Sequence, residues 1–133
     1  MTRTKYAKNA GAVFTLKYHL VWCPKYRRPV LEGAVATRLK SLLETKATEL
    51  EAKIHALEVM PDHIHMFVES DPTQAPARIA AQFKGYTSNV LRREFPQLRS
   101  RLPTLWSRSY FIASVGSVTE VAIQHYIESQ KGK

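Results

Sequence analysis

The sequence predicts an α+β fold: a ferredoxin-like βαββαβ antiparallel sheet with helices on one face, plus a C-terminal helix. Three observations lead to this prediction. Alternating apolar and polar residues mark strands, apolar residues three or four apart mark helices, and these segments follow in the order β-α-β-β-α-β-α. The 133 residues are enough for one domain, which we expect to span 1–133.

The chain begins with a polar, basic stretch. Residues 1–11 end at a glycine and predict a flexible basic arm. From 13 to 23 apolar and polar side chains alternate, which predicts a long, half-buried strand with Lys17 and His19 on its polar side. Pro24 ends this strand, and a basic, aromatic turn follows.

Periodicity and turn residues predict the remaining elements. Because only a Pro-Asp pair separates the second and third strands, these two should form an antiparallel hairpin. After the second helix we expect an arginine-rich loop. The expected elements are a helix at 31–51, strands at 54–60 and 63–69, a helix at 75–95, a strand at 109–115 and a helix at 118–130.

The last helix has its own start signals. Ser117 and Glu120 have the spacing of a capping box, so the helical segment with its flanks spans 117–131. Gly116 stands before it, where a hinge would be placed. We therefore expect this helix to be an appendage to the sheet domain.

The charge balance points to a polyanionic partner. Twenty Lys and Arg residues against eleven Asp and Glu residues give a net charge of +9, which favours nucleic acid over a protein that is merely basic. Cys23 is the single cysteine, which excludes a disulfide framework and a multi-cysteine zinc site. Without an apolar signal core or a membrane span, we expect a cytoplasmic protein that has no membrane partner.

Two histidines stand two residues apart in the third predicted strand. Side chains two apart on a strand share a face, so His63 and His65 could hold one divalent cation, while Ile64 points into the core. An equally good alternative is that the two histidines bind no metal and merely form hydrogen bonds on a solvent-facing surface. Asp62 could orient a ligand histidine or cap the turn, and we favour the turn.

A tyrosine and a glutamine share a face of the last helix. Tyr126 and Gln130 are four residues apart, and a metal-assisted tyrosine nucleophile could use both. A lone tyrosine is more often an amphipathic residue at the core edge, and a lone glutamine a solvated one. His125 points elsewhere and should lie at the surface.

Basic and aromatic side chains are interleaved along the chain, and this mixture suits phosphates and unpaired bases. Each cation alone is more often solvated, so only their total is informative. The candidate DNA contacts are Lys17, Lys25, Arg27, Arg28, Lys84, Arg92 and Arg93.

Four segments together resemble one family. Residues 61–65 contain a His-apolar-His motif with Ile64 at its centre, and 125–130 contain the tyrosine. With 18–27 and 106–110, they resemble the single-tyrosine HUH transposases of the insertion-sequence 200/605 group, where HUH stands for His, a bulky apolar residue, His. The resemblance covers nearly the whole chain in order and spacing.

This resemblance implies a specific activity. His63 and His65 would bind Mg or Mn with Gln130 as third ligand, and Tyr126 would attack a single-stranded DNA phosphate to leave a 5′-phosphotyrosine. The partners would be single-stranded DNA with subterminal hairpins and a second copy of the chain, in a homodimer with composite active sites. No small-molecule cofactor is expected.

Two other readings stay open. A non-catalytic, ferredoxin-like nucleic-acid-binding module would also be basic and carry surface aromatics, although the sequence lacks the Gly-Phe signature of RNA-binding domains. A metal-dependent nuclease that uses water would need the histidines but form no covalent adduct.

Overall fold

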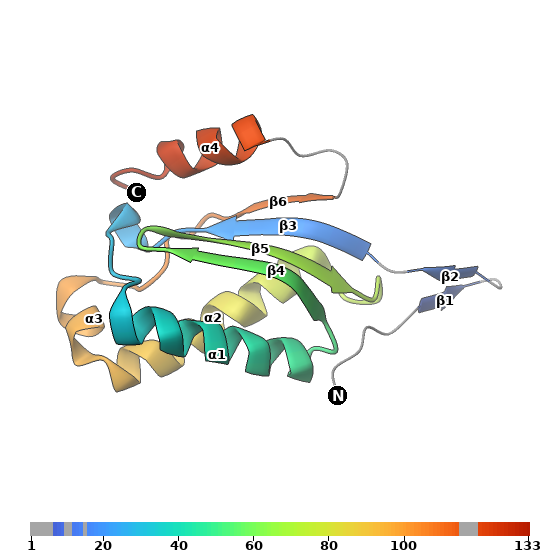
Figure 1. Cartoon of the computed structure of the whole chain (residues 1–133), viewed down its shortest axis with the longest axis horizontal. Coiled ribbons are helices and arrows are strands. Elements are labelled where there is room, and N and C mark those ends of the chain that lie inside the picture. The colour runs from blue at the N-terminus through green and yellow to red at the C-terminus, as the bar shows by residue number, and fades with distance from the viewer. Residues whose placement is uncertain (1–6, 10–11, 15, 115–119) are drawn as a thin grey trace.

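A computed structural model describes residues 7–9, 12–14, 16–114 and 120–133, and its main element is a four-stranded antiparallel sheet in the order β4-β5-β3-β6. Helices α1, α2 and α3 lie on one face of this sheet and α4 lies on the other (Figure 1). This confirms the predicted ferredoxin-like topology with an added C-terminal helix. The bounds are β3 Leu16–Trp22, α1 Gly33–Glu49, β4 Lys53–Met60, β5 His63–Ser70, α2 Pro76–Glu94, α3 Pro96–Arg101, β6 Phe111–Ser114 and α4 Glu120–Ser129.

The predicted first strand is divided in two. β2 (Ala12–Phe14) pairs with β1 (Ala7–Asn9) in a separate two-stranded sheet, and β3 starts at Leu16. The neighbouring strand has a matching end: β5 ends at Ser70, which pairs with Leu16, so the described pairing of β3 with β5 begins at that residue. Residues 7–9 of the expected flexible basic arm over 1–11 form β1, and the rest of that arm lies outside the described residues.

An additional α-helix appears where the sequence predicted none. The segment expected as an arginine-rich loop contains α3, which starts with a proline at its first turn and buries Leu98. The predicted Gly116 hinge and most of the capping box lie in 115–119, outside the described residues. Among the described helices, none is both long and apolar enough to span a membrane.

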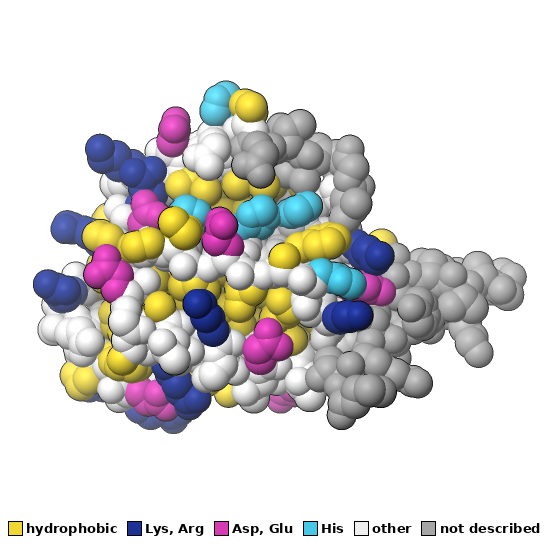
Figure 2. Space-filling model, viewed as in Figure 1, with side chains coloured by type: hydrophobic (Ala, Val, Ile, Leu, Met, Phe, Trp, Pro, Cys, Tyr) yellow, Lys and Arg dark blue, Asp and Glu magenta, His cyan; other side chains and the backbone are white. Residues whose placement is uncertain are grey.

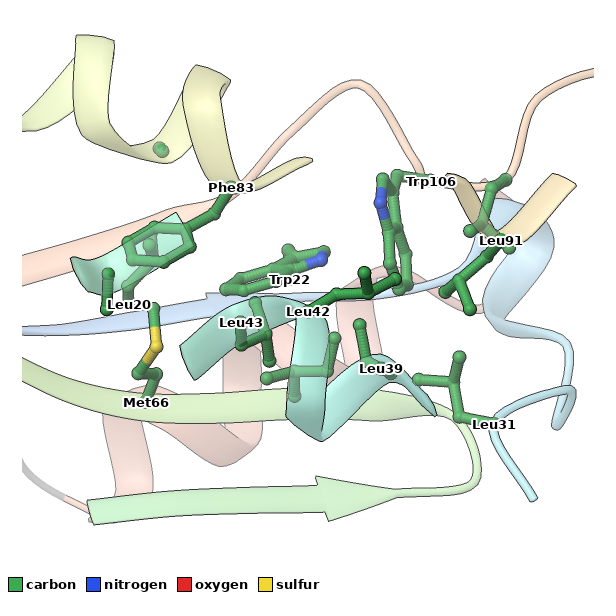
Figure 3. Packing of buried hydrophobic residues seen from close by; sticks show 14 of the residues in the cluster. Leu20, Trp22, Leu31, Leu39, Leu42, Leu43, Met66, Phe83, Leu91 and Trp106 are labelled. Atoms are coloured by element: carbon green, nitrogen blue, oxygen red, sulfur yellow. The ribbon is translucent and has the colours of Figure 1, made fainter. Parts of the chain in front are cut away.

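The core lies between the sheet and the helices α1 and α2 (Figure 3). Leu20 and Trp22 from β3, with Ile64 and Met66 from β5, are fully buried there together with Phe83 of α2. Alternation along a strand then sends the residues between them to the opposite face. The packing of the core therefore decides which side chains of β5 face α4.

The single cysteine is also buried. Cys23 follows β3 directly and has no exposed surface. Burial raises the pKa of its thiol to about 12, so the thiol is protonated at neutral pH. This supports the interpretation of Cys23 as a small structural residue.

Candidate active site

The two histidines of β5 lie on the sheet face that α4 covers. His65 pairs in register with Val21 of β3, and paired residues of neighbouring strands point to the same face. Val21 packs with Ile123 and Ile127 of α4. Figure 2 shows histidine side chains in a row along the strip between α4 and the strands. The expected common face of the histidine pair is therefore present, next to the tyrosine helix.

His63 is oriented by its neighbour Asp62. The Nδ1 atom of His63 lies 2.9 Å from Oδ1 of Asp62, and Oδ2 of Asp62 lies 3.3 Å from Nε of Arg27. A carboxylate at Nδ1 favours the tautomer that carries its proton there, which leaves the lone pair on Nε2. The structure thus corrects our preference for a turn-capping Asp62, because the carboxylate contacts His63 and Arg27.

His65 has a histidine partner that the sequence alone did not predict. Its Nε2 lies 2.9 Å from Nδ1 of His19 on β3, and the His19 ring stacks on Phe67 with 5.0 Å between centroids. The sequence places His19 on the polar side of its strand, but only the β3–β5 register brings it to His65. Among the described residues, no group of three or more His, Cys, Asp and Glu side chains could hold a metal ion.

Tyr126 projects from α4 toward the loop before β6. Its ring packs on Phe111 with 5.7 Å between centroids, and its hydroxyl lies 2.9 Å from Oγ of Ser109. Burial raises the pKa of Tyr126 to about 12. At neutral pH the phenol is therefore protonated in this arrangement.

Gln130 is held by two serines. Its Oε1 accepts hydrogen bonds from Oγ of Ser107 at 3.0 Å and Oγ of Ser109 at 2.8 Å, and its side chain is buried. A hydroxyl carries one proton, so Ser109, which donates to Gln130, must accept the phenol proton of Tyr126. Tyr126 and Gln130 share a face as predicted, and Ser109 contacts both.

Lys84 supports the loop that carries these serines. Its Nζ donates to the backbone oxygens of Ser107 at 2.8 Å, Arg108 at 3.2 Å and Ser109 at 3.0 Å. Burial lowers the pKa of Lys84 to about 8. The sequence suggested Lys84 as a DNA contact, but in the structure its ammonium group is occupied by three carbonyl groups.

Arg27 contacts both the turn before His63 and the last turn of α4. Besides Asp62, its guanidinium group donates from Nη1 to the backbone oxygen of Ile127 at 3.2 Å. The chain reaches this position through two residues with left-handed backbone, Tyr26 at φ 61° and Arg27 at φ 55°. Such residues cost about 1–3 kcal/mol each, and they concentrate at functional sites.

The other predicted DNA contacts fall into three regions. Lys17 is exposed near the start of β3, whereas Lys25 and Arg28 lie beside the ring of Tyr26 after the end of β3, with cations 5.2 Å and 5.9 Å from its centroid. The third region is a shallow groove of about 520 Å³ on α2 and α3. It is lined by Gly85, Ser88, Asn89, Arg92, Arg93 and Arg99.

His63 and His65 lie on the same side of the sheet as Tyr126 and Gln130, but at a different strand. Tyr126 packs over β6, whereas His63 and His65 belong to β5, and β3 lies between these two strands. Two strand spacings separate β5 from β6 by roughly 10 Å at the backbone. The side-chain contacts of Tyr126 and Gln130 described above run to the loop before β6 and not to the histidines.

A tyrosine helix packed over a histidine-bearing, ferredoxin-like sheet is the architecture of a single-tyrosine transposase. In agreement with this class, residues 12–130 match the family described as IS200-like transposases, and the chain belongs to that family.

Individual relatives agree with this assignment. The ISDra2 transposase TnpA of Deinococcus radiodurans is 41% identical over 128 residues, which cover 95% of this chain and 91% of the relative. The transposase for insertion sequence element IS200 of Salmonella typhimurium is 33% identical over 116 residues, covering 86% and 76% of the two chains. Both are similar to this chain over most of its length.

Solved structures support the fold. A crystal structure from Deinococcus radiodurans R1, described as that of a transposase, superposes with a TM-score of 0.86 at 36% identity, covering 96% of this chain and 99% of the other. A REP-associated tyrosine transposase bound to a REP hairpin gives a TM-score of 0.58 at 13% identity, covering 95% and 67%. At this low identity the second likeness concerns the fold alone.

The raised pKa of Tyr126 gives a first prediction. In an alkaline titration followed by phenolate absorbance, the wild type minus Tyr126→Phe difference should show one group that ionises near pH 12 and not near the ordinary 10.0. Because the folded-state pKa is the higher one, the contribution of this group to stability is present below pH 10.0 and is lost as the pH rises through 12. A difference curve centred on the ordinary value would contradict the described packing of Tyr126.

Proposed function

We propose that this transposase cleaves and rejoins single-stranded DNA at the ends of its insertion sequence through a 5′-phosphotyrosine formed on Tyr126. The observation that carries the proposal is the packing of the tyrosine helix on the sheet face that bears His63 and His65. A nucleophile and a set of metal-ligating side chains on one face are the parts that such a reaction needs.

His63, His65 and Gln130 are the proposed ligands of the divalent cation, Mg or Mn. The donor set fits, because Asp62 holds His63 at Nδ1 and leaves Nε2 as the coordinating atom. A cation bound through Nε2 of His65 would replace the contact of that atom with His19. Once bound, the cation would neutralise charge on the phosphate.

Tyr126 forms and breaks the covalent bonds. Its phenolic oxygen attacks the phosphorus, the bond from phosphorus to the 3′ oxygen breaks, the phenol proton is released, and the leaving 3′ oxygen gains a proton. One phosphoester bond replaces another, so a 3′ hydroxyl can later reverse the step without ATP. Because such transfer depends on positioning and charge, the residues that hold Tyr126 matter as much as its reactivity.

The side-chain contacts of α4 must change before this reaction. An amide oxygen has two lone pairs, and Ser107 and Ser109 occupy both on Gln130, so metal binding requires at least one of these hydrogen bonds to break. Either α4 shifts on its own sheet or α4 of a second copy supplies the tyrosine. We propose the second arrangement, a homodimer with composite sites, on the resemblance to the 200/605 group.

The arginine groove on α2 and α3 is the proposed site for the hairpin. Ser88 and Asn89 are each three or four residues away from both Gly85 and Arg92, so the four residues form one stripe along α2. A side-chain-free position at Gly85 lets a sugar-phosphate backbone approach closely, and the arginine side chains supply charge. A duplex stem bound there would lie on the side of the sheet opposite the histidines.

The covalent step can be tested directly. With Mg or Mn and end-labelled single-stranded DNA from the ends of its own element, the protein should form a denaturation-resistant protein–DNA adduct. Tyr126→Phe, which removes only the attacking oxygen, should abolish the adduct while leaving DNA binding within about twofold, because the ring still packs on Phe111. Gel electrophoresis under denaturing conditions measures the adduct, and a mobility-shift gel under native conditions measures the DNA binding.

The alternatives give different results in the same assay. Cleavage without an adduct that persists in Tyr126→Phe would indicate a water-using nuclease. Binding without cleavage, on DNA known to carry the correct ends, would indicate a non-catalytic binding module.

The composite site predicts complementation between two inactive variants. Tyr126→Phe and His63→Ala should each form no adduct alone, whereas mixed dimers should regain it, since one composite site then contains an intact tyrosine and intact histidines. The adduct should be carried by the His63→Ala copy, which a size tag on one variant identifies. No adduct from well-mixed dimers would place the tyrosine and histidines of each site in the same copy.

The groove predicts a change in salt dependence. Arg93→Gln should weaken binding of a hairpin oligonucleotide and reduce the slope of log affinity against log salt by about 0.9 if one duplex phosphate contact is lost. Lys40→Gln, on exposed α1 surface, controls for the net charge. Fluorescence anisotropy at several salt concentrations measures both slopes, and equal changes in the two variants would contradict a specific groove.

A further inference from the structure

We infer that Arg27 is a positioning residue that couples the orientation of the metal ligand His63 to the docking of the tyrosine helix. This inference rests on the proposed function, because it assigns His63 to a metal. The sequence suggested Arg27 as a DNA contact, whereas the structure gives its guanidinium group two protein partners, one in the turn before β5 and one in α4.

The first partner connects Arg27 to the histidine. Nε of Arg27 lies 3.3 Å from one carboxylate oxygen of Asp62, and the other oxygen lies 2.9 Å from Nδ1 of His63. The Arg27 and Asp62 side chains are 22% and 32% exposed, so water screens the pair only in part. Holding one oxygen of Asp62 directs the other one to the imidazole.

The second partner connects Arg27 to α4. Nη1 of Arg27 donates to the backbone oxygen of Ile127, one of the last carbonyl groups of the helix. A positive charge at a helix C-terminus also favours the helix dipole. In the same turn the backbone oxygen of Tyr26 accepts a hydrogen bond from the backbone N–H of Gly132 at 3.4 Å. The turn therefore contacts both α4 and the residues that follow it.

The turn that carries Arg27 has an unusual backbone conformation. Tyr26 and Arg27 both have left-handed φ values that residues with side chains rarely adopt. The turn is held by a hydrogen bond from Lys25 N to the oxygen of Leu105 at 2.8 Å. From this turn the planar guanidinium group of Arg27 contacts Asp62 and the backbone oxygen of Ile127 at the same time. A lysine ammonium group lacks the forked geometry needed for both contacts.

A metal-binding experiment separates positioning from charge. Mn²⁺ is titrated into the full chain and the free ion is followed by electron paramagnetic resonance. If Arg27 acted only through its charge, Arg27→Gln would tighten Mn²⁺ binding, because a cation near the site is lost. Positioning gives the opposite sign: Arg27→Gln should weaken binding by about 3- to 10-fold, less than the roughly 10- to 100-fold of a direct partner such as Asp62.

Three variants complete the design. Arg78→Gln removes an exposed arginine of α2 with the same charge change and should leave Mn²⁺ affinity unaltered. Arg27→Lys keeps the charge but cannot hold both partners, so it should also weaken binding, and it serves if Arg27→Gln does not fold by circular dichroism. Loss of Mn²⁺ binding in His63→Ala first confirms that the titration reports the proposed site.

Hydrogen exchange of α4 provides the second readout. Because coupling is reciprocal, Mn²⁺ should change the exchange of residues 120–130 in the wild type and change it less in Arg27→Gln. Unchanged or tighter Mn²⁺ binding in folded Arg27 variants would overturn the inference while leaving the metal site intact. Mn²⁺ binding that survives His63→Ala would overturn the proposed site itself, which is a separate result.

Discussion

The alternation of side chains along β5 is the constraint on which the rest of the structure depends. Ile64 and Met66 are fully buried against the helices, so the register of the strand is fixed by the core. A slip of one residue would bury His63 and His65 and expose the apolar side chains. The chemistry of the open face is therefore tied to the stability of the opposite face.

The segment 107–109 is the second organising feature. The ammonium group of Lys84 donates hydrogen bonds to the backbone oxygens of this segment. The hydroxyl groups of Ser107 and Ser109 in turn donate to Gln130 at the end of the C-terminal helix. Three parts of the chain that are far apart in sequence meet there: α2, the loop before β6 and the C-terminal helix. The position of Tyr126 is thus set by the packing of α2 as well as by the helix that carries it.

Periodicity and turn residues predicted the order of the elements, the ferredoxin-like topology and the shared faces of His63 with His65 and of Tyr126 with Gln130. These features depend on local spacing, which a single sequence contains. The partners His19, Ser109 and Arg27 were not predicted, because their contacts join distant parts of the chain. His19 meets His65 through strand register, Ser109 meets Tyr126 through the packing of α4, and Arg27 meets Asp62 from a turn with left-handed backbone. The division of the first strand was missed for the same reason, because the pairing of β3 with β5 also joins distant parts of the chain. The roles of the candidate residues in DNA cleavage stay predictions.

The buried Cys23 has a practical consequence for observing this molecule at work. A thiol without exposed surface and with a pKa near 12 reacts slowly with maleimides at neutral pH. Cys23 should therefore contribute little background labelling in the natural chain. A cysteine placed at Val121, which is 62% exposed on α4, would be the one readily modified position. A fluorophore or spin label there would follow the tyrosine helix without any need to remove the native thiol.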